Sequence, residues 1–146
     1  LGGNQLTPDF LQQSAIEGNW QFEYLETLLK GMEKELPAGV SFLDKDGTKR
    51  TAMRLRWWKQ PVDISYKNYG LEVDLDRPIP KGWATNFSYP KNDVPVFVGH
   101  YWLKGQPKLL TPNVCCLDYS VAKGGNLTAY RYSGEHILKE ENLVWV

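Results

Sequence analysis

The stretch PVFVGHYW, residues 95–102, determines how the second half of this chain is expected to fold. Its apolar run is followed by a glycine, by one of only two histidines in the chain, and by two bulky aromatic residues. This pattern predicts a buried strand over residues 94–102, in which Gly99 lets the backbone turn sharply before His100. Because many sites are built on loops at strand ends, His100 is a candidate metal ligand. The alternative is a histidine with no role beyond occupying the strand end.

More strands are expected on the C-terminal side of this stretch. Residues 113–121 and 126–132 are rich in β-formers, and the glycine-rich turn Lys123-Gly124-Gly125-Asn126 lies between them. Weaker strand signals follow at residues 136–139 and 143–146. The adjacent Cys115 and Cys116 would point to opposite faces of a strand, which predicts buried, reduced thiols and a cytoplasmic protein.

A hairpin is expected upstream, in VSFLDKDGTKRTAMRLRWW, residues 40–58. The turn is predicted at residues 44–47, and the second strand is expected to end at Trp57-Trp58. On that strand the alternation puts Arg54 and Arg56 on one face with Trp58, and Met53 and Leu55 on the other. The two arginines are candidates for phosphate binding or base stacking. An ordinary solvated face with ion-pair partners is the alternative.

The N-terminal part, residues 1–36, is predicted to be helical. Thr7-Pro8-Asp9 has the pattern of an N-cap followed by proline at the first helical position. A second helix is expected to continue to Leu36, with an apolar face packed on the core. Its apolar residues are Phe22, Leu25, Leu28, Leu29, Met32 and Leu36. Residues 37–146 then form the β-rich part of a single compact unit of the α+β class.

Composition narrows the possible functions. The chain has 146 residues, with 17 basic and 17 acidic residues that cancel. The absence of net charge argues against a nucleic-acid partner, and the lack of an apolar run of about 20 residues argues against a membrane span. No signal-peptide pattern is present at the N-terminus. Residues 59–94 are irregular and aromatic-rich, which is typical of a loop with a functional or interface role.

Several stretches, in order, resemble the C-terminal end of calcineurin-like metallophosphoesterases, in the branch of bacterial serine/threonine phosphatases and diadenosine tetraphosphatases. They are PVFVGHYW and TPNVCCLDYSVAKGGNLTAYRYSGE, preceded by ETLLKGMEKELPAGVSFLDKDGTKRTAMRLRWW. The resemblance covers roughly residues 22–146. It implies the C-terminal part of an α/β/β/α sandwich, with N-terminal helices followed by a mainly antiparallel or mixed sheet.

The resemblance also implies a two-metal phosphoesterase site that uses Mn, Fe or Zn. His100 would be one metal ligand, whereas Trp102 stands where many relatives have a second histidine. The other family motifs, Asp-x-His, Gly-Asp-x-x-Asp and Asn-His-Glu, do not occur in this sequence. We therefore expect the C-terminal part of a longer hydrolase that acts on a phosphoester substrate, with no catalytic residue of its own and little hydrolysis by this chain alone.

Four further residues are candidates for substrate binding in such a protein. Arg54 and Arg56 would shape access to the substrate, and Tyr101 and Tyr119 would border a phosphate pocket. Asp118 is expected to have a structural role. The competing class is a non-catalytic interaction or ligand-binding domain whose contact surface is the 59–94 region.

An incomplete sandwich would leave an apolar sheet face without its cover. Large bare apolar patches are rarely tolerated by soluble proteins. We therefore expect a homo-oligomer, or a helix laid over the exposed sheet.

Overall fold

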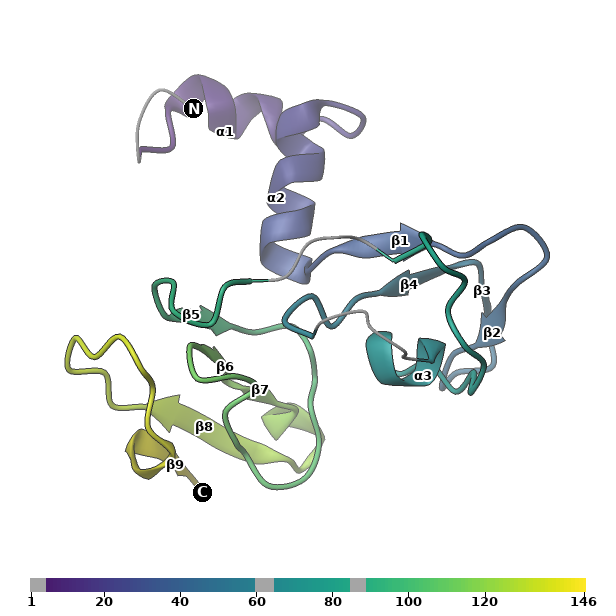
Figure 1. Cartoon of the computed structure of the whole chain (residues 1–146). Helices are drawn as coiled ribbons and strands as arrows, with labels where there is room; N and C mark the ends of the chain where they lie inside the picture. The colour runs from purple at the N-terminus through teal and green to yellow at the C-terminus, as the bar shows by residue number, and fades with distance from the viewer. Residues whose placement is uncertain (1–4, 60–64, 85–88) are drawn as a thin grey trace.

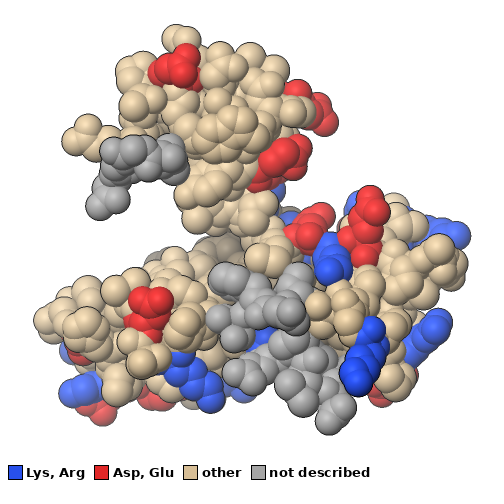
Figure 2. Space-filling model, turned by 45° about the horizontal axis from the view of Figure 1, so that its top comes forward, with Lys and Arg blue, Asp and Glu red and all other residues tan. Residues whose placement is uncertain are grey.

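The computed structural model of the chain describes residues 5–59, 65–84 and 89–146. Helices and short strands are both present, which confirms the mixed α+β class predicted from the sequence. Two N-terminal helices project from one side of a body built of small sheets (Figure 1). The same projection is visible as a separate lobe in the space-filling view (Figure 2). Among the described residues, no helix is long and apolar enough to cross a membrane.

Helices α1 (Pro8–Gln13) and α2 (Trp20–Lys30) form the projection. The predicted N-cap is confirmed, because the backbone N–H of Phe10 donates to the Thr7 hydroxyl at 3.2 Å. Phe10 is buried and meets the rings of Trp20 and Tyr24 edge-on, at centroid distances of 5.7 and 6.1 Å. These edge-to-face contacts join the two helices.

Helix α2 ends six residues earlier than predicted. Gly31 adopts a positive φ of +93°, which stops the helix, and Glu33–Glu35 then forms strand β1. The prediction that α2 packs on the core is also wrong. No residue of α2 is buried, and the side chains of Leu28 and Leu29 are 65% and 64% exposed. The apolar residues of α2 do recur at helical spacing, but the described part of the chain buries none of them.

The predicted hairpin forms around its predicted turn. Strands β2 (Phe42–Leu43) and β3 (Lys49–Arg50) pair antiparallel. The Asp44 carboxylate accepts hydrogen bonds from the Arg50 side chain and from the backbone N–H groups of Asp46 and Thr48. The bond from Arg50, followed by that from Thr48, lowers the pKa of Asp44. This network fixes the turn.

Strand β4 (Ala52–Arg54) pairs antiparallel with β1, a partner that the sequence did not indicate. Met53 and Leu55 are buried, in agreement with the predicted face. The strand does not continue to Trp57-Trp58 as predicted, since Leu55 makes only an isolated bridge to Gly70 and the chain then turns.

Helix α3 (Tyr66–Tyr69) packs next to this turn. Residues 71–75 form no strand, although Val73 is buried there. Each buried tyrosine of α3 contacts the core cluster around Met53 and Leu55. The helix therefore fills the space beside β4 in place of a further strand.

The C-terminal half contains two small sheets (Figure 1). Strand β5 (Val96–Val98) runs parallel to β6 (Val114–Cys116). It is shorter than the predicted strand at residues 94–102, because His100 and Trp102 adopt positive φ values, and none of its three residues is fully buried. The second sheet has the order β7-β8-β9, and all of its pairings are antiparallel. Its strands are β7 (Asp118–Tyr119), β8 (Asn126–Tyr130) and β9 (Leu143–Trp145). The predicted strand at residues 113–121 is thus divided at Leu117 between two sheets.

The weak strand predicted at residues 136–139 is not formed, and a hydrogen-bonded turn stands in its place. The Glu135 carboxylate accepts bonds from the Tyr130 hydroxyl at 2.6 Å, from the Ser133 backbone at 2.8 Å and from the Asn142 amide at 3.0 Å. These bonds, with that from Tyr130 the largest cause, lower the pKa of Glu135 to about 2. The Glu135 carboxylate therefore joins the end of β8 to the turn before β9.

The position of Gly31 gives a first prediction. A Cβ at this residue would overlap the Tyr101 hydroxyl, and its positive φ adds strain for any other residue. We expect Gly31→Ala to lower the free energy of unfolding by roughly 2–4 kcal/mol. Gly39→Ala is the matched control, because Gly39 has a similar φ of +79° and open space around its Cβ position. Equal losses in urea unfolding for the two variants would contradict the close approach.

The Glu135 network gives a second prediction. Because the folded-state pKa of Glu135 lies below its unfolded value, the network stabilises the fold above about pH 5. That contribution is lost as the pH falls toward 2. Unfolding curves for Glu135→Gln should show a weaker decline of stability between pH 5 and 2.5 than those for the unsubstituted protein. The exposed Glu141→Gln is the control, and it should follow the unsubstituted profile.

Candidate functional site

His100 lies in a turn of unusual backbone conformation, directly after β5. His100 and Trp102 have positive φ values of +63° and +47°, a backbone conformation that residues other than glycine rarely adopt. Hydrogen bonds hold this turn from two directions. Arg54 Nη1 donates to the His100 carbonyl at 3.0 Å, and Asp118 accepts from the Trp102 backbone at 3.3 Å. The turn is therefore fixed by its neighbours and not by local preference.

The His100 imidazole packs against the Trp102 ring, with centroids 5.4 Å apart. Within the described residues, no group of three or more His, Cys, Asp and Glu side chains comes together as a metal site would require. The described part of the chain therefore does not fit a divalent-metal centre at His100. The role of His100 as a metal ligand stays a prediction about a longer protein.

Arg54 is a connecting residue in this structure. Its guanidinium joins the His100 carbonyl to Glu33, whose carboxylate lies 3.3 Å from Nη2. Arg54 thereby ties the β1–β4 pair to the turn after β5. It does not line the pocket that contains the other predicted substrate-binding residues. Of the two alternatives drawn from the sequence, the structure shows Arg54 with an ion-pair partner.

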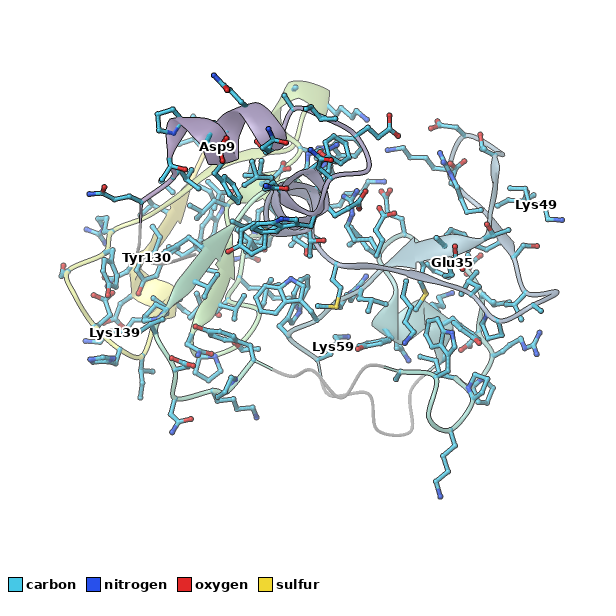
Figure 3. All side chains as sticks on the ribbon, turned by 90° about the horizontal axis from the view of Figure 1, so that it is seen from above. Asp9, Glu35, Lys49, Lys59, Tyr130 and Lys139 are labelled. Atoms are coloured by element: carbon cyan, nitrogen blue, oxygen red, sulfur yellow. The ribbon has the colours of Figure 1, made fainter. Side chains whose placement is uncertain are left out.

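The other three predicted residues, Arg56, Tyr101 and Tyr119, line one cavity of about 600 Å³. Three lysines that the sequence did not single out line it as well: Lys59, Lys104 and Lys108. We call this cavity the basic pocket. Arg56 and Lys59 come from the turn after β4, whereas Lys104 and Lys108 come from the segment between β5 and β6. Lys59 lies between the half of the molecule that holds Glu35 and the half that holds Tyr130 (Figure 3).

Backbone contacts fix the position of Arg56. Its N–H donates to the Tyr69 carbonyl at 2.8 Å, and its Nε donates to the Gly70 carbonyl at 3.1 Å. Burial of the guanidinium lowers the pKa of Arg56, although the group remains charged at neutral pH. Lys59 Nζ donates to the Asn68 carbonyl at 3.2 Å on the same side of the pocket. Both cations are therefore held in place by α3 and the residue that follows it.

The charge in the basic pocket is unbalanced. Burial is the largest cause that lowers the pKa of Lys59, and the positive charges of Arg56 and Lys108 lower it further. Glu72 is the one carboxylate that lines the pocket in the described part of the chain, and its oxygen already lies 3.8 Å from Lys45 Nζ. The unbalanced cations make the pocket a suitable place for an anion.

Tyr101 and Tyr119 both line the pocket, while their hydroxyl groups make hydrogen bonds within the protein. The Tyr101 hydroxyl accepts from Trp57 Nε1 at 2.9 Å. The Tyr119 hydroxyl accepts from the Lys108 backbone N–H at 3.0 Å and donates to its carbonyl at 3.2 Å. Tyr119 thus fixes the backbone of Lys108 at the rim. The pocket wall also contains Trp58 and Trp102, so its surface combines cationic and aromatic groups.

The sequence gives only a weak indication that these three lysines belong to a binding site. Lys59 follows the aromatic pair Trp57-Trp58, and Lys104 and Lys108 lie 45 and 49 residues further along the chain. A single lysine in a loop is normally a solvated residue. Only the packing of the turn after β4 against the 103–110 segment, through Trp58, Leu103 and Leu110, brings these charges to a common cavity.

The two cysteines lie beside this site and do not take part in it. Both are free and buried, as predicted. Burial raises the pKa of Cys115 to about 12 and that of Cys116 to about 11. Thiols with such pKa values are protonated at neutral pH and are poor nucleophiles.

Comparison with family models, with curated proteins and with solved structures finds no match to this chain.

The electrostatics of the basic pocket give a third prediction. Because its pKa is lowered, Lys59 should be acetylated faster at pH 8 than the exposed Lys91, as measured by mass spectrometry. Replacing Lys108 by glutamine removes one of the charges that lower this pKa and should slow the acetylation of Lys59. Lys67→Gln, outside the pocket, should not alter it. An unchanged rate in Lys108→Gln would show that the two ammonium groups do not interact.

Proposed function

We propose that this chain binds a small phosphate-bearing anion in the basic pocket. One observation carries the proposal: Arg56, Lys59 and Lys108 meet in a single cavity whose one lining carboxylate, among the described residues, is already beside another lysine. Gathering like charges costs free energy, and a bound anion removes that cost. The arrangement of charges therefore destabilises the free chain and favours a bound anion.

The size and wall of the pocket support a small organic ligand. A volume of about 600 Å³ lies in the range of small-molecule sites. Arginine binds phosphate with two parallel hydrogen bonds, and lysine adds point charges. The rings of Trp58 and Trp102 offer apolar surface next to these cations. A phosphate monoester with an apolar group fits both parts of the wall.

The proposal is a binding function, and hydrolysis is not part of it. The resemblance to metallophosphoesterases predicts a phosphoester as the ligand, with Mn, Fe or Zn held in a longer protein. His100 and the described residues around it do not form that metal centre. The binding proposed here therefore depends on the cations of the pocket and on no metal ion.

A titration with phenyl phosphate tests the proposal. Tryptophan fluorescence should report saturable binding, because Trp58 and Trp102 line the pocket. Replacing Lys108 by glutamine should weaken binding about tenfold, since it removes one charged contact. Higher salt should weaken binding as well.

The matched control is Lys91→Gln, which removes the same charge from an exposed position outside the pocket. It should bind phenyl phosphate as the unsubstituted protein does. Equal weakening by the two variants would point to non-specific attraction. No saturable signal at millimolar phenyl phosphate would overturn the proposed function.

A further inference from the structure

The helical arm, residues 8–30, exposes apolar side chains along its whole length. Trp20, Leu28 and Leu29 are each at least 60% exposed, and α2 contains no buried residue. A helix of 11 residues is marginal in water and normally depends on packing of its apolar face. Among the described residues, the core clusters of the body include no residue of the arm, and the ring contacts of Phe10 join the arm to itself. Its apolar face therefore requires another surface.

An apolar groove of about 760 Å³ lies between the arm and β5. Trp20, Tyr24 and Leu28 form the wall on the arm, and Val96–Val98 forms the wall on the body. Glu23 is the one charged residue that lines it in the described part of the chain. Tyr101 lines both this groove and the basic pocket, and among the described residues it is the one lining residue that the two cavities share.

Strand β5 is an edge strand of its two-stranded sheet, and its three residues line the groove. Among the described residues it pairs only with β6, and that pairing is parallel. All three residues of β6 are 0% exposed, whereas those of β5 are only partly covered. Residues 94–99 contain no charge that would protect the edge. Parallel strands are normally covered on both faces, so this edge is incomplete in a single chain.

The arm and the body carry opposite charges. The arm has four carboxylates, Asp9, Glu17, Glu23 and Glu26, and one ammonium group, Lys30. Its net charge is therefore −3, and because the whole chain is neutral, the remaining residues carry +3. Figure 2 shows the acidic side chains on the lobe and the Lys and Arg side chains mainly on the body. In net charge the arm is thus complementary to the rest of another molecule, while the described lining of the groove itself contains no Lys or Arg.

We propose that the arm and the edge of β5 form the interface of a homodimer. In a twofold arrangement, the arm of each copy covers the groove beside β5 of the other copy. A second copy fits because every chain supplies both an acidic apolar arm and a basic body with an open apolar edge. Apart from Tyr101, the described residues that line the groove and the basic pocket are different, and the interface does not depend on the ligand proposed above.

Sedimentation velocity between about 1 and 200 µM protein tests the dimer. The full chain should sediment as a dimer at the upper end of this range. Leu28→Glu places a charge in the groove wall and should raise the dimer dissociation constant about 100-fold. Ile137→Glu is the matched control, because Ile137 is also 65% exposed but lies outside the groove. It should leave the dissociation constant unchanged.

Hydrogen exchange locates the interface independently. Amides of β5 and α2 should be protected at high concentration and lose protection in Leu28→Glu, while those of β8 should not change. Circular dichroism of the variant shows whether the monomer keeps its fold. A monomer at every concentration overturns the proposal, and so does a dimer that Leu28→Glu weakens no more than Ile137→Glu. In the first case the groove belongs to a different partner, and in the second the interface lies elsewhere.

Discussion

Much of this structure depends on the packing of Tyr101. Its ring is buried against Trp58, with centroids 5.1 Å apart, and its hydroxyl accepts the indole N–H of Trp57. The same hydroxyl lies so close to Gly31 that no side chain fits there. One aromatic residue thus joins the end of α2, the turn after β4 and the turn after β5. Burial of this phenol raises the pKa of Tyr101, as expected for a group that must remain neutral.

Tyr101 also lines two chemically different cavities. The first is the basic pocket, where Arg56 and three lysines meet aromatic rings. The second is an apolar groove with a single charged lining residue among those described. A charged small molecule suits the first surface and an apolar protein surface suits the second. The two proposed activities therefore need not compete for space.

His100 and Arg54 show how residues that the sequence marks as candidates for a site can have a structural use. The strained turn at residues 100–102 is held by a hydrogen bond from Arg54 and by the Asp118 carboxylate. These bonds position Trp102 at the pocket wall, where Lys45 and Lys123 lie 4.7 and 4.9 Å from its ring. In this structure the turn therefore places an aromatic ring among lysines at the wall of the basic pocket. Metal ligation by His100 would need partners that the described residues do not bring near it.

The sequence by itself determined those elements that depend on interactions between residues close together in the chain. The N-cap at Thr7, the turn at Asp44, the strand before Gly99 and the buried thiols all follow from residues near one another in the chain. Tertiary structure decided the rest, because long-range packing overrides periodicity. It ended α2 at Gly31 below Tyr101 and divided the 113–121 run between two sheets. It also gathered Lys59 and Lys108 beside Arg56, and no spacing in a sequence encodes the meeting of charges that lie 49 residues apart.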